Sequence, residues 1–329
     1  MKKLLTLLLL VTFLSTPFNA QGLYYPTDPY IEYQDYFGAI DFMASNPSGH
    51  PEGEGVVVAV IDSGVWQGHS DLVGKFWTNN KETPNNGIDD DNNGYVDDYY
   101  GYNFVDNNAN LITYDSHGTA VSDIIAAKRD DNGILGIANK SKIMSLIACG
   151  GEDVGCTDNA VQKAIKYAAD NGADIINLSL GYGNGYVGYK SSYDYYIKYA
   201  FDRDVIIVAA AGNGDIEGYS TGLDLNNFSV SPVCNDDSNN MIVGVGASDA
   251  SWSNYGNRCV DIKAPGVDIF TGSVPTHDVY TWQELSGTSF SAPMVAAAAA
   301  IIKSKQPSLK NWEITERKAK ALKRSKPCK

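Results

Sequence analysis

The sequence predicts an α/β fold, a three-layer sandwich with a mostly parallel central sheet and helices on both faces. One observation is that residues 56–61 form a continuous β-branched run, which is typical of a strand buried on both faces of a sheet. The others are that similar short runs recur along the chain and that segments with helical spacing separate them. Alternating strands and helices favour a parallel sheet, in which sites form beyond the carboxyl ends of the strands.

The same patterns locate the individual elements. Four further strands are expected at residues 142–148, 174–178, 205–210 and 241–245. Helices are expected at 157–171, 193–202, 117–127 and 295–302, the last of these being alanine-rich. Pro293 is expected in the first turn of that last helix, where its missing N–H costs little. Glycine and asparagine clusters at 85–93, 181–188 and 211–227 indicate loops.

The first residues have the pattern of an export signal. A positive start, Met1 to Lys3, precedes an apolar run at 4–14, which is shorter than the about 20 residues of a membrane span. Ala20 is a plausible last residue before cleavage. We expect residues 1–20 to be a signal peptide and 21–329 to form one domain; a buried N-terminal helix is the alternative. No later stretch is apolar enough for a membrane anchor, so a soluble, secreted monomer is expected, extracellular or periplasmic.

Charge and composition argue against several classes of protein. The formal net charge of −14 disfavours a nucleic-acid partner, because phosphate binding needs a basic surface. The basic tail from Lys303 onward is an exception, which we interpret as a solvated helix face rather than a patch for an acidic partner. The sequence has four histidines, no Cys–His pairing and no zinc-like spacing. These features argue against a cysteine protease or a zinc enzyme.

Five cysteines in an exported chain indicate disulfides with one thiol left over. Cys149 and Cys156 are close in sequence and could close a small loop. Cys234 and Cys259 could form a second bridge, which would leave Cys328 in the tail. Connectivity is not determined by the sequence, so other pairings remain open.

Four polar residues occupy positions where a catalytic site could form. Asp62 ends the first strand, and His117 begins a helix next to Gly118, which lets another backbone approach closely. Ser289 precedes the alanine-rich helix, where backbone N–H groups and the helix dipole favour negative charge. Asn213 lies in a Gly-Asn-Gly turn after a strand. Taken singly, each residue is equally compatible with a turn or a helix cap.

Taken together, these residues resemble a known family. The order Asp62, His117, Ser289 is the chain order of subtilisin. Residues 58–64, 117–121, 176–181, 210–213 and 286–295 closely resemble the signature segments of the subtilisin-like (subtilase) serine peptidases. The similarity extends from about residue 28 to residue 322, nearly the whole mature chain. It implies the subtilisin-like fold and a serine endopeptidase that acts on polypeptides.

The resemblance also implies a role for each site residue. Ser289 is expected to attack the peptide carbonyl, His117 to carry its proton to the leaving amine, and Asp62 to fix the imidazole tautomer and stabilise the imidazolium. Asn213 is similar to the oxyanion-hole asparagine of the family. An extended substrate is expected to pair by strand addition with two strand edges that line the first specificity pocket. The residues of these edges are Ser179, Leu180 and Gly181, and Ala210, Ala211 and Gly212.

An aspartate-rich segment follows the pattern of a calcium loop. Asp89, Asp91 and Asn93, a glycine at the sixth place and Asp97 at the ninth match an EF-hand-like arrangement. The usual glutamate at the twelfth place is absent, and Asp98 is expected to supply the extra carboxylate. Five carboxylates within ten residues repel one another unless a cation neutralises them. We therefore favour Ca²⁺ over a solvated acidic turn, and several subtilases carry similar insertions.

A second calcium site is implied by the resemblance alone. Asp28, Asp71 and Asp130 match positions at which thermitase-like subtilases bind calcium and thereby tie the N-terminal segment to the core. Without the resemblance, these three isolated aspartates would not indicate a metal site.

Two features differ from the usual family pattern. The predicted signal ends close to the start of the family-like sequence, so we expect no separate pro-domain, although most secreted subtilases carry one to assist folding. Ala120 replaces a histidine often found just after the first one, but that histidine is not catalytic.

Two other functions remain open beside an active endopeptidase. A non-enzymatic, calcium-binding interaction protein on the same scaffold would fit the missing pro-domain, but not the complete set of four site residues. Another serine hydrolase, such as an esterase, is disfavoured because no G-x-S-x-G elbow surrounds Ser289.

Overall fold

A computed structural model of the protein describes residues 27–40, 42, 52–113, 115–150, 155–181, 188–214, 221–235, 240–248, 250–274 and 282–315. The predicted signal peptide and Cys328 lie outside these residues. Within them, no helix is long and apolar enough to cross a membrane. Both expected disulfides are present, Cys149–Cys156 and Cys234–Cys259.

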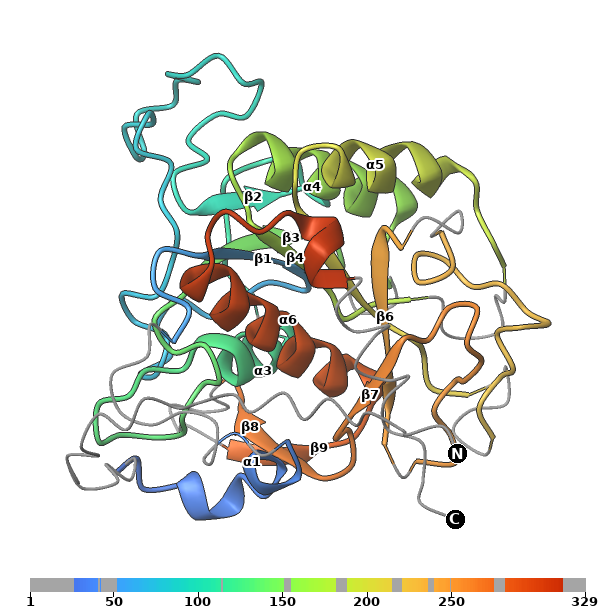
Figure 1. The fold of residues 1–329 in the computed structure, drawn as a ribbon. Helices are drawn as coiled ribbons and strands as arrows, with labels where there is room; N and C mark the ends of the chain where they lie inside the picture. Colours follow the sequence, from blue (N-terminus) through green and yellow to red (C-terminus); the bar gives the residue numbers. More distant parts are fainter. Residues whose placement is uncertain are drawn as a thin grey trace, which may run out of the picture.

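The centre of the fold is a seven-stranded parallel sheet with the strand order β2-β3-β1-β4-β5-β6-β7 (Figure 1). Its strands are β1 (Val57–Asp62), β2 (Gly101–Asn103), β3 (Lys142–Ile147), β4 (Ile175–Leu178), β5 (Ile206–Ala210), β6 (Ile242–Ala247) and β7 (Ile262–Ala264). β1 pairs with β3 and β4, and β4 pairs in turn with β5. Because the strands are parallel, their carboxyl ends, such as Asp62, Leu178 and Ala210, meet at one edge of the sheet.

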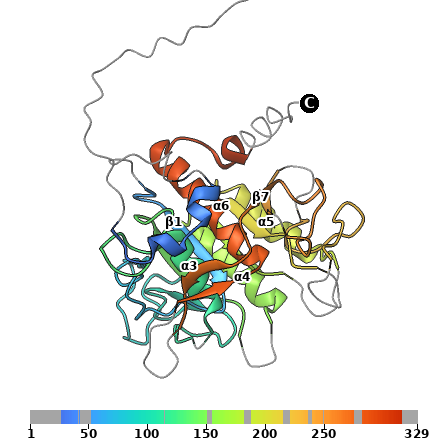
Figure 2. The same ribbon diagram turned by 90° about the horizontal axis from the view of Figure 1, so that it is seen from below.

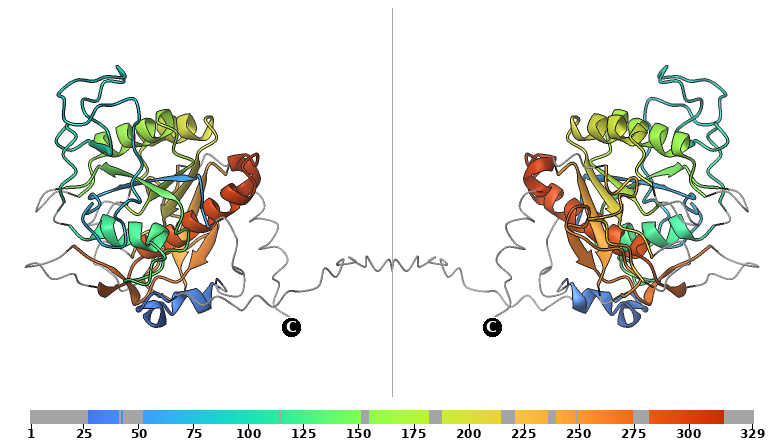
Figure 3. Two further views of the ribbon diagram at one scale, coloured as in Figure 1. Left: turned by 90° about the vertical axis from the view of Figure 1, so that its left-hand side faces the viewer. Right: turned by 90° about the vertical axis from the view of Figure 1, so that its right-hand side faces the viewer.

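Helices cover both faces of this sheet (Figure 3). α3 (His117–Ala126) and α6 (Thr288–Lys305) lie on one face, and α4 (Asp158–Asp170) and α5 (Ser192–Phe201) lie on the other. Alternate residues of β1 belong to the two cores: Val58 and Val60 pack with α3 and α6, whereas Ala59 and Ile61 pack with α4 and α5. The predicted three-layer sandwich is therefore confirmed, and the β-branched run is buried on both faces.

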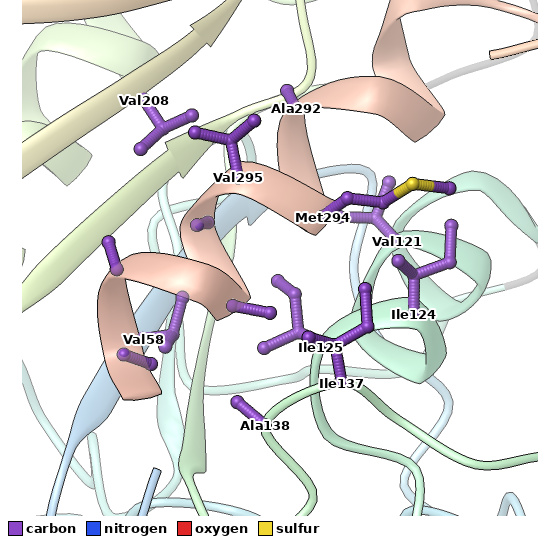
Figure 4. Close-up of a cluster of buried hydrophobic side chains, with 14 of the residues drawn as sticks. Val58, Val121, Ile124, Ile125, Ile137, Ala138, Val208, Ala292, Met294 and Val295 are labelled. Atoms are coloured by element: carbon purple, nitrogen blue, oxygen red, sulfur yellow. The ribbon is translucent and has the colours of Figure 1, made fainter. Parts of the chain in front are cut away.

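The core on the α6 side explains the composition of that helix. Val295 of α6 points toward Val208 of β5, and Met294 lies beside Val121 of α3 (Figure 4). All four side chains are buried, and burying a side chain of this size stabilises the fold by about 1.5–3 kcal/mol. α6 packs against the sheet on one side and against α3 on another, which accounts for its many small alanines.

A two-stranded antiparallel pair, β8 (Ile269–Gly272) and β9 (Trp282–Leu285), lies beside α3 (Figure 2). The N-terminal segment with η1 (Ile31–Tyr33) and α1 (Tyr36–Ala39) packs against it. The ring of Tyr30 lies 4.7 Å from that of Trp282, and Gln34 exchanges two hydrogen bonds of 2.9 Å with the backbone of Leu135. The N-terminal segment is thus anchored to the core on the α3 side.

The expected strands and helices are confirmed, with bounds that differ by one or two residues, except at the last helix. α6 begins at Thr288, so Pro293 is its sixth residue, and the prediction of Pro293 in the first turn was wrong. The helix begins early because the backbone N–H of Thr288 donates to the side chain of Asn213 at 2.8 Å. A capping contact from a distant loop leaves no trace in the local apolar pattern.

Candidate active site

Asp62 occupies the carboxyl end of the central strand β1 and is only 2% exposed. Its Oδ1 accepts hydrogen bonds from the backbone N–H of Ser63 at 2.7 Å and from the Ser63 hydroxyl at 3.2 Å. The fold therefore presents a fixed, buried carboxylate at the edge of the sheet where sites are expected.

His117, the first residue of α3, meets this carboxylate directly. Its Nδ1 donates to Asp62 Oδ1 at 2.8 Å, which leaves Nε2 as the nitrogen available to a second partner. A Cβ at Gly118 would overlap the carbonyl oxygen of Gly64 and lie 3.1 Å from Asp62 Oδ1. The expectation that Gly118 allows a close backbone approach is confirmed, because only glycine lets α3 start this near β1.

The environment of His117 changes its basicity. Burial by itself lowers the pKa of this imidazole, but the carboxylate of Asp62 opposes that effect through its charge and its hydrogen bond, with a smaller contribution from Asp115. The net result is a pKa raised above the ordinary value of 6.5. The site therefore contains a base strengthened by a buried partner.

Ser289 is the second residue of α6, among the first four residues whose N–H groups have no intrahelical partner. Its hydroxyl donates to the carbonyl of Ser179 at 3.2 Å, and the hydroxyl of Ser179 donates back to the carbonyl of Ser289 at 2.7 Å. The ring of Phe290 lies 5.5 Å from that of His117. The start of α6 is thus placed between the end of β4 and the start of α3.

Asn213 lies just beyond β5, with its amide oriented by Thr288. Its Oδ1 accepts from the Thr288 backbone N–H and from the Thr288 hydroxyl, both at 2.8 Å. The same amide's Nδ2 is therefore the end that remains as a donor. Asn254 shapes the turn, because its Nδ2 donates to Ala211 O at 2.8 Å and its Oδ1 accepts from Gly214 N at 3.2 Å.

The two expected substrate edges follow adjacent strands. Leu178 of β4 pairs with Ala209 of β5, so the segments with Ser179, Leu180 and Gly181 and with Ala210, Ala211 and Gly212 leave the sheet next to each other. The side chains of Ser179, Leu180, Ala210 and Ala211 are buried.

Comparison with known proteins identifies the family. The model of the subtilase family matches residues 53–325. The chain belongs to the subtilase family. It is 32% identical to thermitase of Thermoactinomyces vulgaris over 289 residues, which are 88% of each chain. A thermophilic serine proteinase of Bacillus sp. (strain AK1) is 35% identical over 76% of this chain and 52% of its own length.

The fold of this subtilase is shared with solved structures. A cold-adapted subtilisin-like serine proteinase matches it with a TM-score of 0.60 and 25% identity, over 82% of this chain and 83% of its own. Family membership and these relatives make the protein a serine-type endopeptidase, a hydrolase whose substrates are polypeptides.

The aspartate-rich segment of this subtilase brings two predicted ligands together with a residue that sequence reasoning missed. Oxygen atoms of Asp89 and Asp91 lie within 4.8 Å of each other and of Glu82. Glu82 Oε1 accepts from the backbone N–H of Asp91 at 3.1 Å, whereas the buried Oε2 has no hydrogen-bond partner among the described residues. An unsatisfied buried oxygen beside two carboxylates fits a calcium ion, which binds oxygen ligands.

The other predicted ligands of that segment have additional partners. Asn93 Oδ1 accepts from Tyr95 N at 2.8 Å, and Asp97 accepts from the backbone of Asn86 and Gly87. Asp98 is fully buried and accepts from the Tyr167 hydroxyl of α4 at 2.6 Å. Glu82 carried no signal in the sequence, because it lies outside the EF-hand-like spacing.

The second predicted calcium set surrounds the loop after α3. Asp28 is 1% exposed; its Oδ1 accepts from the backbone N–H of Asp130 at 3.2 Å, and its buried Oδ2 has no hydrogen-bond partner in the described chain. The carboxylate of Asp71 accepts from Ile134 N at 3.0 Å. The carboxylate of Asp130, however, pairs with Lys128 at 2.7 Å. Asp28 and Asp71 thus fit a cation better in this structure than Asp130 does.

A hollow of about 770 Å³ is lined by residues of the aspartate-rich segment and of the loop after β1. Asn85, Asp97, Tyr100, Thr113 and Val274 are among the residues that line it. Thr113 donates to Ser63 O at 2.9 Å, and Val274 N donates to the hydroxyl of Ser116 at 3.1 Å. The wall of the hollow is therefore bonded to the residues that follow Asp62 and precede His117.

Proposed function

We propose that this subtilase cleaves peptide bonds through an acyl-enzyme formed on Ser289, with His117 as general base and Asp62 as its orienting partner. The observation that carries this proposal is the 2.8 Å hydrogen bond from His117 Nδ1 to the buried Asp62. It presents Nε2 of a strengthened base beside the start of α6, where the Phe290 ring lies 5.5 Å from the imidazole.

The first step requires a rotation of the serine side chain. The Ser289 hydroxyl leaves the carbonyl of Ser179 and donates its hydrogen to His117 Nε2. As the oxygen attacks the peptide carbonyl carbon, a C–O bond forms and the proton moves to Nε2. The carbonyl π electrons move onto oxygen, and the resulting oxyanion accepts from Asn213 Nδ2 and from the Ser289 backbone N–H.

The intermediate then collapses. The C–N bond breaks, and His117 gives its proton to the leaving amine. A water molecule then hydrolyses the acyl-enzyme ester by the same steps. His117 takes a proton from the water as its oxygen bonds to the acyl carbon. The bond from the acyl carbon to the Ser289 oxygen then breaks, and His117 returns the proton to Ser289. Throughout, Asp62 stabilises the imidazolium form and holds Nδ1 protonated without itself accepting a proton.

The polypeptide would bind in extended form between the two segments that leave β4 and β5. Backbone groups of Ser179, Leu180 and Gly181 on one side, and of Ala210, Ala211 and Gly212 on the other, would pair with it as added strands. The parallel pairing of β4 with β5 supports this mode, because it sets the two segments next to each other. Main-chain pairing of this kind provides affinity without selecting a sequence.

We further propose that calcium stabilises the fold at two places. Glu82 joins the predicted set Asp89, Asp91, Asn93, Asp97 and Asp98 at one site, and Asp28, Asp71 and Asp130 form the other. Bound calcium would neutralise these carboxylates and hold the loops they lie on. The unsatisfied buried oxygens of Glu82 and Asp28 support both sites.

We also infer export. Residues 1–20 would act as a signal peptide, and 21–329 would form one monomeric catalytic domain. The two disulfides support this inference, because such bonds persist in oxidising compartments.

The experiment that tests the activity is cleavage of casein by the purified protein with calcium, wild type beside Ser289→Ala. Cleavage by the wild type alone is expected. Equal cleavage by both proteins would contradict the role of Ser289. A folded but inactive wild type that also fails to react with a serine-directed phosphonate would favour a non-enzymatic role for the scaffold.

A further inference from the structure

A second group of side chains that can bind a metal ion lies outside the proposed triad. His69 and Asp71 belong to the loop after β1, and Asp123 lies on α3, six residues after His117. All three side chains are 0% exposed. One ligand atom of each lies within 4.8 Å of the others, so the three atoms could share a single ion.

Two members of this group lack the partners that buried polar atoms normally have. Neither nitrogen of His69 and neither carboxylate oxygen of Asp123 has a hydrogen-bond partner among the described residues. His69 Nδ1 lies 3.5 Å from Asp123 Oδ1, which is longer than an N–H···O hydrogen bond. Buried polar side chains almost always have hydrogen-bond partners, so four atoms without such partners at one place indicate a bound ligand.

Glycines border the same space. A Cβ at Gly272 of β8 would overlap Asp123 Oδ2 and lie 2.7 Å from His69 Nε2. A Cβ at Gly133 would overlap the carboxylate of Asp71. The neighbouring backbones therefore leave this room to the three side chains.

We propose that His69, Asp71 and Asp123 bind a divalent transition-metal ion such as Zn²⁺. One imidazole nitrogen and two carboxylate oxygens are common zinc ligands, and a backbone carbonyl or a water molecule can complete a tetrahedral set. The imidazole distinguishes this cluster from the calcium sites, because calcium selects oxygen ligands whereas imidazole suits zinc, copper and nickel. The ion would also balance the charge of two buried carboxylates.

The position of the cluster suggests a structural role. An ion there would join the loop after Asp62, the helix that begins with His117, and β8 through Gly272. It would not touch the reacting atoms, so the site is independent of the proposed peptidase chemistry. Asp71 also belongs to a proposed calcium set, and for this reason the test uses His69 and Asp123, which belong to this cluster alone.

The test measures metal content in the intact protein. Wild type, His69→Gln, Asp123→Asn and a control, Glu82→Gln in the other acidic cluster, are each made in the Ser289→Ala background to prevent self-cleavage. They are expressed with added Zn²⁺, or in parallel with Co²⁺, and dialysed against buffer that contains Ca²⁺ but no transition metal. Elemental analysis then gives zinc per chain, and the visible absorption of Co²⁺ reports nitrogen and oxygen coordination.

About one zinc ion per chain is expected in the parent and in the Glu82→Gln control, with a tenfold or greater loss in both cluster variants. The Co²⁺ absorption should be lost in parallel. No metal in the folded parent, or equal metal in all four proteins, would overturn the proposal. The metal content of the parent tests the proposal by itself, so the proposal can still be tested if a variant fails to fold.

Discussion

Ser179 and Ser289 exchange two hydrogen bonds, each hydroxyl donating to the other residue's carbonyl, at 2.7 and 3.2 Å. Pro293 makes this possible. It lies four residues after Ser289 in α6 and has no N–H to donate to the Ser289 carbonyl, which instead accepts the Ser179 hydroxyl. A proline inside the helix thus leaves the Ser289 carbonyl free to bond Ser179, which connects the proposed nucleophile to the end of β4.

Replacing Ser179 by alanine should therefore destabilise the protein and disturb Ser289. The lost donor leaves a part-buried carbonyl unsatisfied, at about 1–3 kcal/mol. Thermal unfolding in the Ser289→Ala background and peptide turnover in the active enzyme would measure the two effects. Ser191→Ala is the matched control, because Ser191 is exposed, and a change within about 0.5 kcal/mol is expected. Equal melting of both variants would contradict this role of Ser179.

The pH dependence of cleavage should report the Asp62–His117 pair. The pKa of His117 is raised above 6.5, and the neutral imidazole is the proposed catalytic base. Activity should therefore fall as the pH drops, with the midpoint of the acid limb in kcat/KM above pH 6.5.

Asp62→Asn should move that midpoint to lower pH and reduce kcat by about 10⁴, because the pair loses its charge and its tautomer control. Asp115→Asn should lower the midpoint by less and keep most of the activity, since Asp115 acts only through its charge. An acid limb that stays in place in both variants would show that another group controls the profile.

The substitution Asn213→Asp tests the two ends of the Asn213 amide separately. The variant keeps an oxygen that can accept from Thr288 and loses the Nδ2 donor. We expect kcat to fall by at least about a hundred- to thousand-fold, the loss known for such a donor in subtilisin, while KM changes little. Near-normal turnover would exclude this residue from the oxyanion hole.

Removal of calcium should lower the melting temperature and open the aspartate-rich segment to an added protease. Calcium at 100 times its Kd would contribute about 2.7 kcal/mol, and each kcal/mol corresponds to roughly 2–4 °C in a domain of this size. The measurement is best made in the Ser289→Ala background.

Glu82→Gln should reduce the calcium effect, because Glu82 lies with Asp89 and Asp91. Asp90→Asn is the control, since Asp90 lies outside the proposed ligand set. Unchanged melting of the parent after verified metal removal would contradict structural calcium.

The long apolar runs made most of the fold predictable. Residues such as Val58 and Ile61 form a strand buried on both faces, and that burial leaves a continuous β-branched signature. Strands β2, β7, β8 and β9 were missed because they are short and interrupted by polar residues or glycine, so that they form no continuous apolar run. The edges of the sheet depend on pairing partners that the local sequence does not reveal.

The residues of the candidate site also differ in whether the sequence predicts them. Asp62, His117, Ser289 and Asn213 lie in compact motifs, so the sequence alone is enough to propose them. Residues that position them from a distance have no such signature: Asn254 shapes the turn around Asn213, and Glu82 completes the acidic cluster. Their roles arise only when loops far apart in the chain fold against each other.

The central claim, a Ser289 nucleophile activated by His117, is tested most directly by mapping the adduct of a serine-directed phosphonate. The purified protein is labelled with calcium present, digested and sequenced by mass spectrometry, wild type beside His117→Ala. We predict a single adduct on Ser289 in the wild type, formed more slowly by orders of magnitude in the variant. An adduct on another residue, or equal labelling rates in the two folded proteins, would contradict the claim.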